Sequence, residues 1–312
     1  TTDGKNNGFG YVPGLDMFNP QYGAAITLTG DPYHIKLKQT GLYAQNQFKW
    51  DNWLLNAGVR HDKAKSSGYI GTVDQSYDVN HTSYNAGLMY QFDIGLSPYV
   101  NYSESFRPIS GGDAKNNAYK PYEGRQLEAG LKYSPVNVDG RFSIAYFDLQ
   151  EKNALVSDAS NVQVQAGERR GRVVELQADV NLNDNWSLAG AYTYTDSKQD
   201  LSTDTTIRSP MMPRHMASTQ VAYKFNTGAL NGLKLGTSLR YVGSTTDDQY
   251  YAGHTIPSYT LWDAMAQYTF AKDWQVQLNA RNLTDKDYVS ACSFYCYYGA
   301  GRSVEASLSY KW

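Results

Sequence analysis

Apolar and polar residues alternate along most of this 312-residue chain, and this period of two constrains the fold more than any other feature. It is clear over Val174–Leu182, Leu233–Tyr241 and Trp274–Arg281, where apolar residues occupy every second position. Successive side chains of a β-strand point to opposite faces of the sheet, so the alternation predicts strands with one apolar and one polar face. Because no stretch shows a convincing helical period, we predict an all-β fold.

Thirteen segments carry this pattern. They cover residues 35–50, 53–66, 82–93, 96–107, 122–134, 140–152, 162–182, 186–199, 214–226, 232–245, 258–271, 273–283 and 301–312. The connections between them alternate between short and long, which a water-soluble sandwich has no reason to do. Transmembrane barrels have short periplasmic turns and long extracellular loops. We therefore predict a transmembrane antiparallel β-barrel of the outer membrane.

Aromatic residues gather beside the short connections, in a chain that contains 27 tyrosines. The residues concerned are Trp50, Trp53, Phe92, Tyr133, Trp186, Phe225, Phe270 and Trp274. Such clustering at one end of successive strands is typical of the aromatic girdle at a membrane interface. The alternative is the core of a water-soluble barrel, which would spread its aromatic residues along the strands.

Charge and residue pattern exclude several functions. The 28 basic and 30 acidic residues give a net charge of −2, without the basic excess of a nucleic-acid-binding protein. No run of about 18 apolar residues predicts a membrane-spanning helix. We discern neither a Ser–His–Asp arrangement nor histidines at metal-ligand spacing. We interpret Asp247–Asp248 as solvated residues of a loop, and Glu123 and Glu128 as solvated residues of a lumen face. We therefore predict that the protein is not an enzyme, although His215 could serve as a metal ligand or base.

The C-terminal segment indicates how the strands are oriented. Leu308, Tyr310 and Trp312 alternate with polar residues, a pattern that outer-membrane barrels present to their assembly machinery. If Trp312 lies at the periplasmic rim, every long loop faces outward and residues 1–34 form an outer loop before the barrel portion, residues 35–312. Bacterial single-chain barrels have an even number of strands, and no secretory leader is recognisable at Thr1. We expect this sequence to be the C-terminal part of a larger barrel.

A series of short motifs resembles TonB-dependent siderophore receptors, in the order of that family. The motifs are Gln39–Gln45, Trp50–Trp53, Ser97–Pro108, Tyr122–Tyr133, Pro213–His215, Asn282–Tyr288 and Gly301–Val304. The resemblance implies a barrel of about 22 strands with a plugged lumen, of which the plug and about nine strands are absent from this sequence. It also implies uptake of a ferric siderophore, energised by the TonB–ExbB–ExbD complex through the absent N-terminal region. Expected further partners are outer-membrane lipid, lipopolysaccharide and the barrel assembly machinery.

The chain's two cysteines, Cys292 and Cys296, are four positions apart and have no histidine neighbours. This favours a local disulfide in an oxidising compartment over a zinc site, with two unpaired thiols as the alternative. Together with Tyr297 and Tyr298, the pair resembles the last outer loop of the ferrichrome and ferric hydroxamate branch of the family. In that branch the iron is carried inside the ligand, so we expect neither a protein metal site nor a cofactor.

Tyrosines at loop or strand-top positions are the candidate ligand contacts. They are Tyr119, Tyr122, Tyr250, Tyr251, Tyr288, Tyr295, Tyr297 and Tyr298, to which we add Phe294. A tyrosine ring offers a rigid apolar face and one hydrogen-bonding group at low entropic cost, which suits an amphipathic metal chelate. The alternative for each is a place in the outer aromatic girdle.

The sequence leaves other functions open. The main alternative to a siderophore receptor is a passive outer-membrane porin or substrate-specific channel. A barrel enzyme would need an acid–His or Ser–His cluster at its rim. Transport of vitamin B12 or haem is a further alternative, and the sequence does not identify the siderophore. Asn282–Thr284 matches a glycosylation sequon, but we read it as a structural turn.

Overall fold

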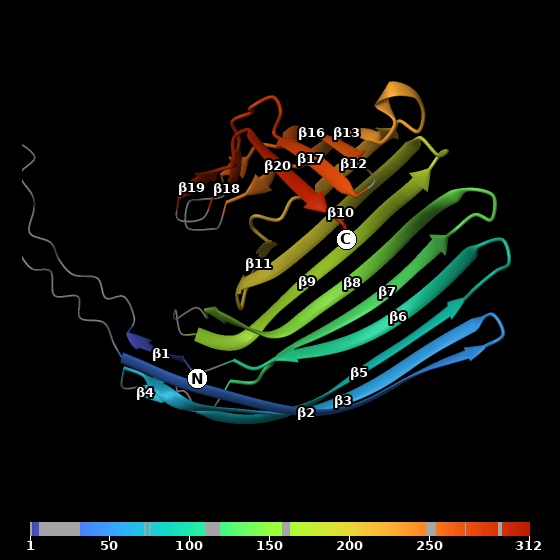
Figure 1. Ribbon diagram of the computed structural model, residues 1–312. Helices are drawn as coiled ribbons and strands as arrows, with labels where there is room; N and C mark the ends of the chain where they lie inside the picture. The colour runs from blue at the N-terminus through green and yellow to red at the C-terminus, as the bar shows by residue number, and fades with distance from the viewer. Residues whose placement is uncertain are drawn as a thin grey trace, which may run out of the picture.

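A computed structural model describes residues 2–5, 32–71, 73–74, 76–109, 119–157, 163–247, 254–271, 273–292 and 295–312. Most of these residues form one strongly curved sheet, in which long strands that follow one another along the chain are hydrogen-bonded neighbours (Figure 1). Two further sheets of two short strands each accompany it among the described residues. Within the described part of the chain, the only helix is the single turn Gly228–Leu230, and no helix is long and apolar enough to cross a membrane. The predicted all-β, antiparallel fold is confirmed.

Thirteen long strands build the sheet, as predicted. They are β2 (Pro32–Trp50), β3 (Trp53–Ile70), β5 (Tyr77–Tyr90), β6 (Leu96–Arg107), β7 (Tyr122–Tyr133), β8 (Asp139–Ser157), β9 (Gln163–Asn181), β10 (Trp186–Ser202), β12 (His215–Lys224), β13 (Leu233–Val242), β16 (Tyr259–Phe270), β17 (Trp274–Arg281) and β20 (Ser303–Tyr310). The described residues also contain seven short strands. β1 (Thr2–Lys5), β4 (Val73–Asp74) and β11 (Thr205–Arg208) pair with this sheet, whereas β14 (Thr245–Thr246) pairs with β15 (Thr255–Ile256) and β18 (Val289–Cys292) with β19 (Cys296–Tyr298).

Several strands extend further at their outer ends than the sequence predicts. β8 continues to Ser157, β10 to Ser202, and β5 begins at Tyr77. The range expected as an outer loop, residues 1–34, contains β1 and the first residues of β2, which pair with each other. The reason is that apolar residues no longer keep to the outward face beyond the apolar band. β8 continues with the consecutive apolar residues Ala154–Val156, and in β5 the buried Tyr77 faces inward, opposite Ser66, while Asp78 faces outward, opposite Lys65.

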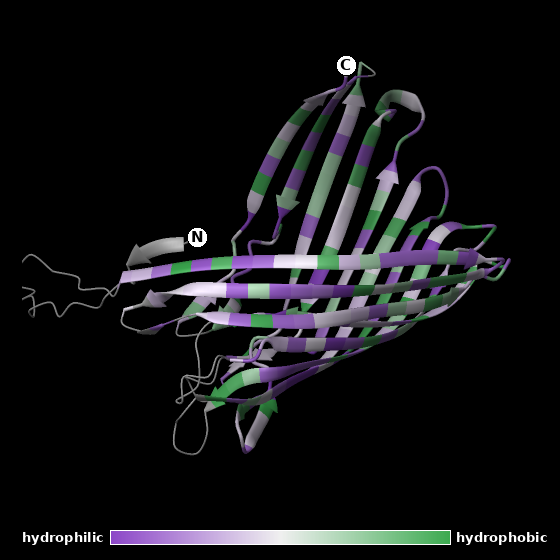
Figure 2. Cartoon of the chain, turned by 90° about the horizontal axis from the view of Figure 1, so that it is seen from below, coloured by the Kyte–Doolittle hydropathy of each residue, from purple (hydrophilic) through white to green (hydrophobic). Residues whose placement is uncertain are grey.

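The pairing register separates the two faces of the sheet. Leu176 lies opposite Ile144 on one side and Tyr192 on the other, whereas the next residue, Gln177, lies opposite Ser143 and Ala191. Figure 2 shows the resulting alternation of apolar and polar residues along the strands. In β3 the outward residues Leu55 and Val59 are exposed and Asn56 is half-buried, as expected where side chains crowd on a concave inner face. The apolar face is therefore the lipid-facing exterior, and the polar face lines the lumen.

The ends of the strands beside the short turns carry clusters of packed rings. Trp53 contacts Tyr90 at 4.7 Å between ring centroids, and Tyr90 contacts Phe92 at 4.6 Å. The same arrangement recurs where Trp186, Tyr223 and Phe225 meet at 4.8 and 4.7 Å. The edge-to-face geometry of these pairs is one that aromatic rings favour. This arrangement fits the predicted aromatic girdle at the periplasmic interface.

Candidate ligand-binding surface at the outer end

A disulfide-closed hairpin carries three of the predicted ligand tyrosines. Strands β18 and β19 pair through Ala291 and Tyr297, and a disulfide joins Cys292 to Cys296. Tyr295, Tyr297 and Tyr298 are 67%, 55% and 76% exposed. The hairpin therefore presents three solvent-facing rings on two short strands, which the disulfide joins beside their connecting loop.

Asn282 fixes the base of this hairpin. Its side chain is only 2% exposed, and its backbone adopts a φ of 50°, in the left-handed region that Asn tolerates. The side-chain amide donates to the carbonyl oxygens of Lys286 and Ala300 at 2.9 and 3.2 Å, and its oxygen accepts from the Lys286 N–H at 2.8 Å. The Asn282 side chain thus links Lys286 to Ala300 by hydrogen bonds. This structural role explains Asn282 better than the sequon does.

Tyr288 packs at the point where the hairpin leaves the barrel. Its ring lies 4.3 Å from that of Tyr259, between centroids, and the Gly299 N–H donates to the Tyr288 carbonyl at 2.8 Å. A Cβ atom at position 299 would collide with the Tyr288 ring, so this close approach requires glycine. The hairpin is therefore anchored by packing as well as by hydrogen bonds.

A second group of predicted tyrosines lies at the start of β7. Tyr122 is paired with Arg107 on the lumen-facing side, and the Arg107 guanidinium lies 4.6 Å from the centroid of the Tyr122 ring. Such a cation–π contact holds the ring and presents a positive charge beside it. Tyr119 is half-buried three residues earlier, beyond the end of the β6–β7 ladder.

The structure divides the predicted ligand residues between these two segments, the β18–β19 hairpin and residues 119–122. Tyr250, Tyr251 and Phe294 lie outside the described residues. Leu308 and Tyr310 lie in β20, and Tyr310 contacts Trp274 at 4.9 Å between centroids. The roles of all these residues in binding and in assembly stay predictions.

Two acidic residues differ from the predicted solvated surface. Asp247 is only 3% exposed, and its carboxylate lies 3.3 Å from Nδ1 of His254. Glu123 and Glu128 lie on opposite faces, since five residues separate them in a continuous strand. Glu123 faces outward, whereas Glu128 faces the lumen and accepts a hydrogen bond from the Tyr99 hydroxyl at 2.6 Å. The prediction of solvated carboxylates was wrong for Asp247, and that of a shared lumen face was wrong for Glu123.

His215 packs against tyrosines on the outward face. Its Nδ1 lies 2.8 Å from the Tyr192 hydroxyl, and its ring lies 5.3 Å from that of Tyr194, between centroids. Among the described residues, no three His, Cys, Asp or Glu side chains gather as metal ligands would. His215 is an exposed side chain whose contacts are with tyrosines.

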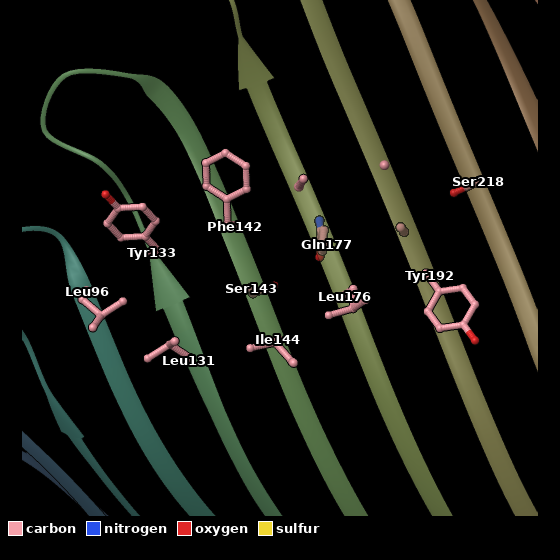
Figure 3. A pocket seen from close by; sticks show the side chains of 13 residues that line it. Leu96, Leu131, Tyr133, Phe142, Ser143, Ile144, Leu176, Gln177, Tyr192 and Ser218 are labelled. Atoms are coloured by element: carbon pink, nitrogen blue, oxygen red, sulfur yellow. The ribbon is translucent and has the colours of Figure 1, made fainter.

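A shallow apolar groove of 660 Å³ lies on the lipid-facing side (Figure 3). Phe142, Ile144, Leu176 and Tyr192 line it. It arises where the small residues Ala178 and Gly190 are paired between these larger side chains. Because its apolar lining belongs to the exterior of the barrel wall, we do not assign it to a polar ligand.

Comparison with known proteins agrees with this architecture. The family model "TonB dependent receptor-like, beta-barrel" matches residues 2–283. The chain is 39% identical to the ferrioxamine B receptor of Salmonella typhimurium (strain SL1344), over 97% of this chain and 45% of the receptor. It is 37% identical to the ferrichrome outer membrane transporter/phage receptor of Escherichia coli (strain K12), over 98% of this chain and 44% of the transporter.

Solved structures show the same fold. The ferric-catecholate import receptor Fiu of E. coli K12 superposes with a TM-score of 0.80 at 20% identity, over 98% of this chain and 50% of that one. The chain spans less than half the length of the ferrioxamine B receptor and of the ferrichrome transporter. The sheet topology, the two differently lined faces and the family match lead to one conclusion: the chain belongs to the TonB-dependent receptor β-barrel family of the Gram-negative outer membrane.

Proposed function

We propose that this chain forms part of the barrel of an outer-membrane receptor that takes up a ferric hydroxamate siderophore with energy supplied through TonB. The observation that carries the proposal is the 39% and 37% identity, along nearly the whole chain, to receptors named for ferrioxamine B and ferrichrome. Both of these compounds are hydroxamate siderophores. The iron enters inside the ligand, so the protein needs no metal site or cofactor of its own.

The exposed tyrosines of the β18–β19 hairpin support this ligand class. A ferric hydroxamate presents an apolar backbone and several oxygen atoms around an enclosed metal. Tyr297 and Tyr298 offer aromatic faces for the former and hydroxyl groups for the latter. Tyr122 adds a ring beside the positive charge of Arg107, which suits the partial negative charge on hydroxamate oxygens.

The expected contact with lipopolysaccharide has support of its own. Four lysines, Lys36, Lys38, Lys63 and Lys65, lie on the outward face beyond the apolar band, and Lys38 is paired directly with Lys65. Asp78 forms ion pairs with two of the four, at 2.7 Å from Lys65 and 3.8 Å from Lys63. Like charges opposite each other destabilise a sheet, and phosphate groups of a lipid head group would relieve this repulsion. Dependence on the barrel assembly machinery stays a prediction.

Growth under iron limitation tests the proposed function. The full-length receptor is expressed in an indicator strain that lacks its own hydroxamate receptors, with and without TonB, and ferrioxamine B or ferrichrome is the sole iron source. We expect growth only when TonB is present. Growth without TonB, together with steady conductance in planar bilayers, would favour the alternative of a passive channel.

A further inference from the structure

We propose that Gln165 and Asn153 are positioning residues that hold the segment 119–122 in place for ligand binding. This inference rests on the proposed function, because it takes Tyr119 and Tyr122 as ligand contacts. Neither residue belongs to the predicted ligand set, and neither carries a charge that would attract notice in the sequence.

Gln165 clamps both backbone groups of a single residue. Its side-chain oxygen accepts from the Lys120 N–H at 2.6 Å, and its amide nitrogen donates to the Lys120 carbonyl at 2.7 Å. The Gln165 amide thus replaces the two hydrogen bonds that a neighbouring strand would make with that residue. The same nitrogen also donates to the Asn153 carbonyl at 3.1 Å.

Asn153 secures the adjacent residue. Its side-chain amide donates to the carbonyl of Pro121, a buried proline, at 2.8 Å. Asn153 has a φ of 61° and lies at an irregularity of the β8–β9 pairing, between Glu151 and Ala154. A conformation that Asn tolerates therefore directs its side chain onto the neighbouring segment.

These contacts cross a strand of the sheet. The ladder between β7 and β8 begins at Glu123 and Lys152, so residues 119–121 lie beyond its last pair. Gln165 belongs to β9, which β8 separates from β7. The segment therefore crosses β8 to reach Gln165, and side-chain amides hold it where no backbone ladder does.

The clamp determines where two candidate ligand tyrosines lie. Tyr119 precedes the clamped residues and Tyr122 follows them, with its ring under the Arg107 guanidinium. Fixing the backbone before the ligand arrives removes part of the ordering cost of binding. Loss of the clamp should accordingly weaken ligand binding while leaving the barrel wall intact.

The test uses the full-length receptor in outer-membrane vesicles, with ferrioxamine B as the probe. Gln165→Met keeps the length of the side chain and removes its hydrogen bonds, and Asn153→Gly keeps the backbone conformation and removes the amide. Gln91→Met, at an exposed periplasmic turn, is the matched control. We expect each clamp variant to raise the Kd about tenfold and to accelerate hydrogen exchange of the Lys120 amide, with the heat stability of the barrel unchanged.

The variant Gln165→Glu distinguishes a loss of hydrogen bonds from a loss of packing, through the pH dependence of its affinity. Its carboxylate cannot donate to the two carbonyl groups, but protonation below a pH of about 4 restores one donor. We expect its affinity, relative to wild type at the same pH, to recover partly at low pH, and that of Gln165→Met to stay low.

Two results would overturn the proposal. The first is a Kd unchanged in Gln165→Met while the wild type binds the probe. The second is a Lys120 amide that exchanges in the wild type as fast as in an unstructured peptide. A wild-type receptor that binds neither ferrioxamine B nor ferrichrome would contradict the proposed function and, with it, the positioning role. The exchange measurement would still test the hydrogen bonds between Gln165 and Lys120.

Discussion

The two ends of the barrel wall are built by different rules. At the periplasmic end, packed rings recur at successive short turns, as in Trp53 with Tyr90 and Trp186 with Tyr223. At the outer end, individual side chains such as Asn282 and Gln165 satisfy the backbone of particular loops. One end repeats a motif that suits any membrane interface, and the other uses contacts that occur once.

This difference separates stability from specificity. An aromatic girdle stabilises every strand in the same way, because the interface is the same around the barrel. A ligand-binding surface needs particular rings in particular places, and single polar side chains can supply that placement. We expect substitutions at the periplasmic end to change stability and substitutions at the outer end to change affinity.

The largest effect should come from the lipid-facing wall that joins the two ends. Leu176→Arg places a charge on the outward face in the middle of the apolar band and should cost about 2–4 kcal/mol of folding stability. Gln177→Arg, one residue further, points to the lumen and is the matched control. Urea-induced unfolding in lipid vesicles measures both variants, and equal losses would contradict the assignment of faces.

Asn282→Ala should produce the next largest effect, at the outer end alone. The variant leaves the backbone groups of Lys286 and Ala300 without partners, at a cost of about 1–3 kcal/mol to the local structure of the loop. Hydrogen exchange should accelerate in residues 285–300, and affinity for the siderophore should fall with it. The exposed neighbour Thr284→Ala serves as control, and a loss of whole-barrel stability would show that the loop is not independent of the wall.

Tyr223→Leu should have a smaller effect, at the periplasmic end. It removes two ring contacts, with Trp186 and Phe225, and should lower stability by about 1 kcal/mol. The midpoint of heat-induced unfolding measures this loss. Because the residue lies at the opposite end from the candidate ligand surface, the Kd for a ferric hydroxamate should not change, and a weakened Kd would contradict the separation.

The smallest effect concerns pH at the outer end. The hydrogen bond from Lys65 holds the pKa of the Asp78 carboxyl below its ordinary value, and Lys63 acts in the same direction. A lowered pKa in the folded state means that the contribution to stability is present at neutral pH and is lost as the pH falls through that lowered pKa. Wild type should therefore be more heat-stable than Asp78→Asn at pH 6, and the difference should vanish in strong acid. A difference that persists there would contradict the ion pair as its cause.

The repeated features of the wall could be predicted from the sequence, and the single contacts could not. Alternation placed all thirteen long strands, because the membrane imposes one apolar face over the whole band. It failed at the outer ends of β5, β8 and β10, where apolar residues no longer keep to the outward face. It also missed the burial of Asp247 and the clamp by Gln165, since both depend on segments that are distant in sequence or on hydrogen bonds that no pattern records.

The candidate site was predictable only in part, for the same reason. The exposed rings of Tyr297 and Tyr298 follow from their place beside the two cysteines in a long connection. The contact between Arg107 and Tyr122 depends on the register of β6 and β7, which the residue pattern alone does not fix.

Equilibrium binding of a ferric hydroxamate to matched pairs of variants tests the central claim most directly. The pair Tyr297→Ala and Tyr298→Ala, combined in one full-length receptor, alters the outer end, and the pair Trp186→Leu and Tyr223→Leu alters the periplasmic end. We predict that the first weakens the Kd at least tenfold with unchanged heat stability, and that the second lowers heat stability with an unchanged Kd. A Kd that the outer-end pair leaves intact would contradict the account.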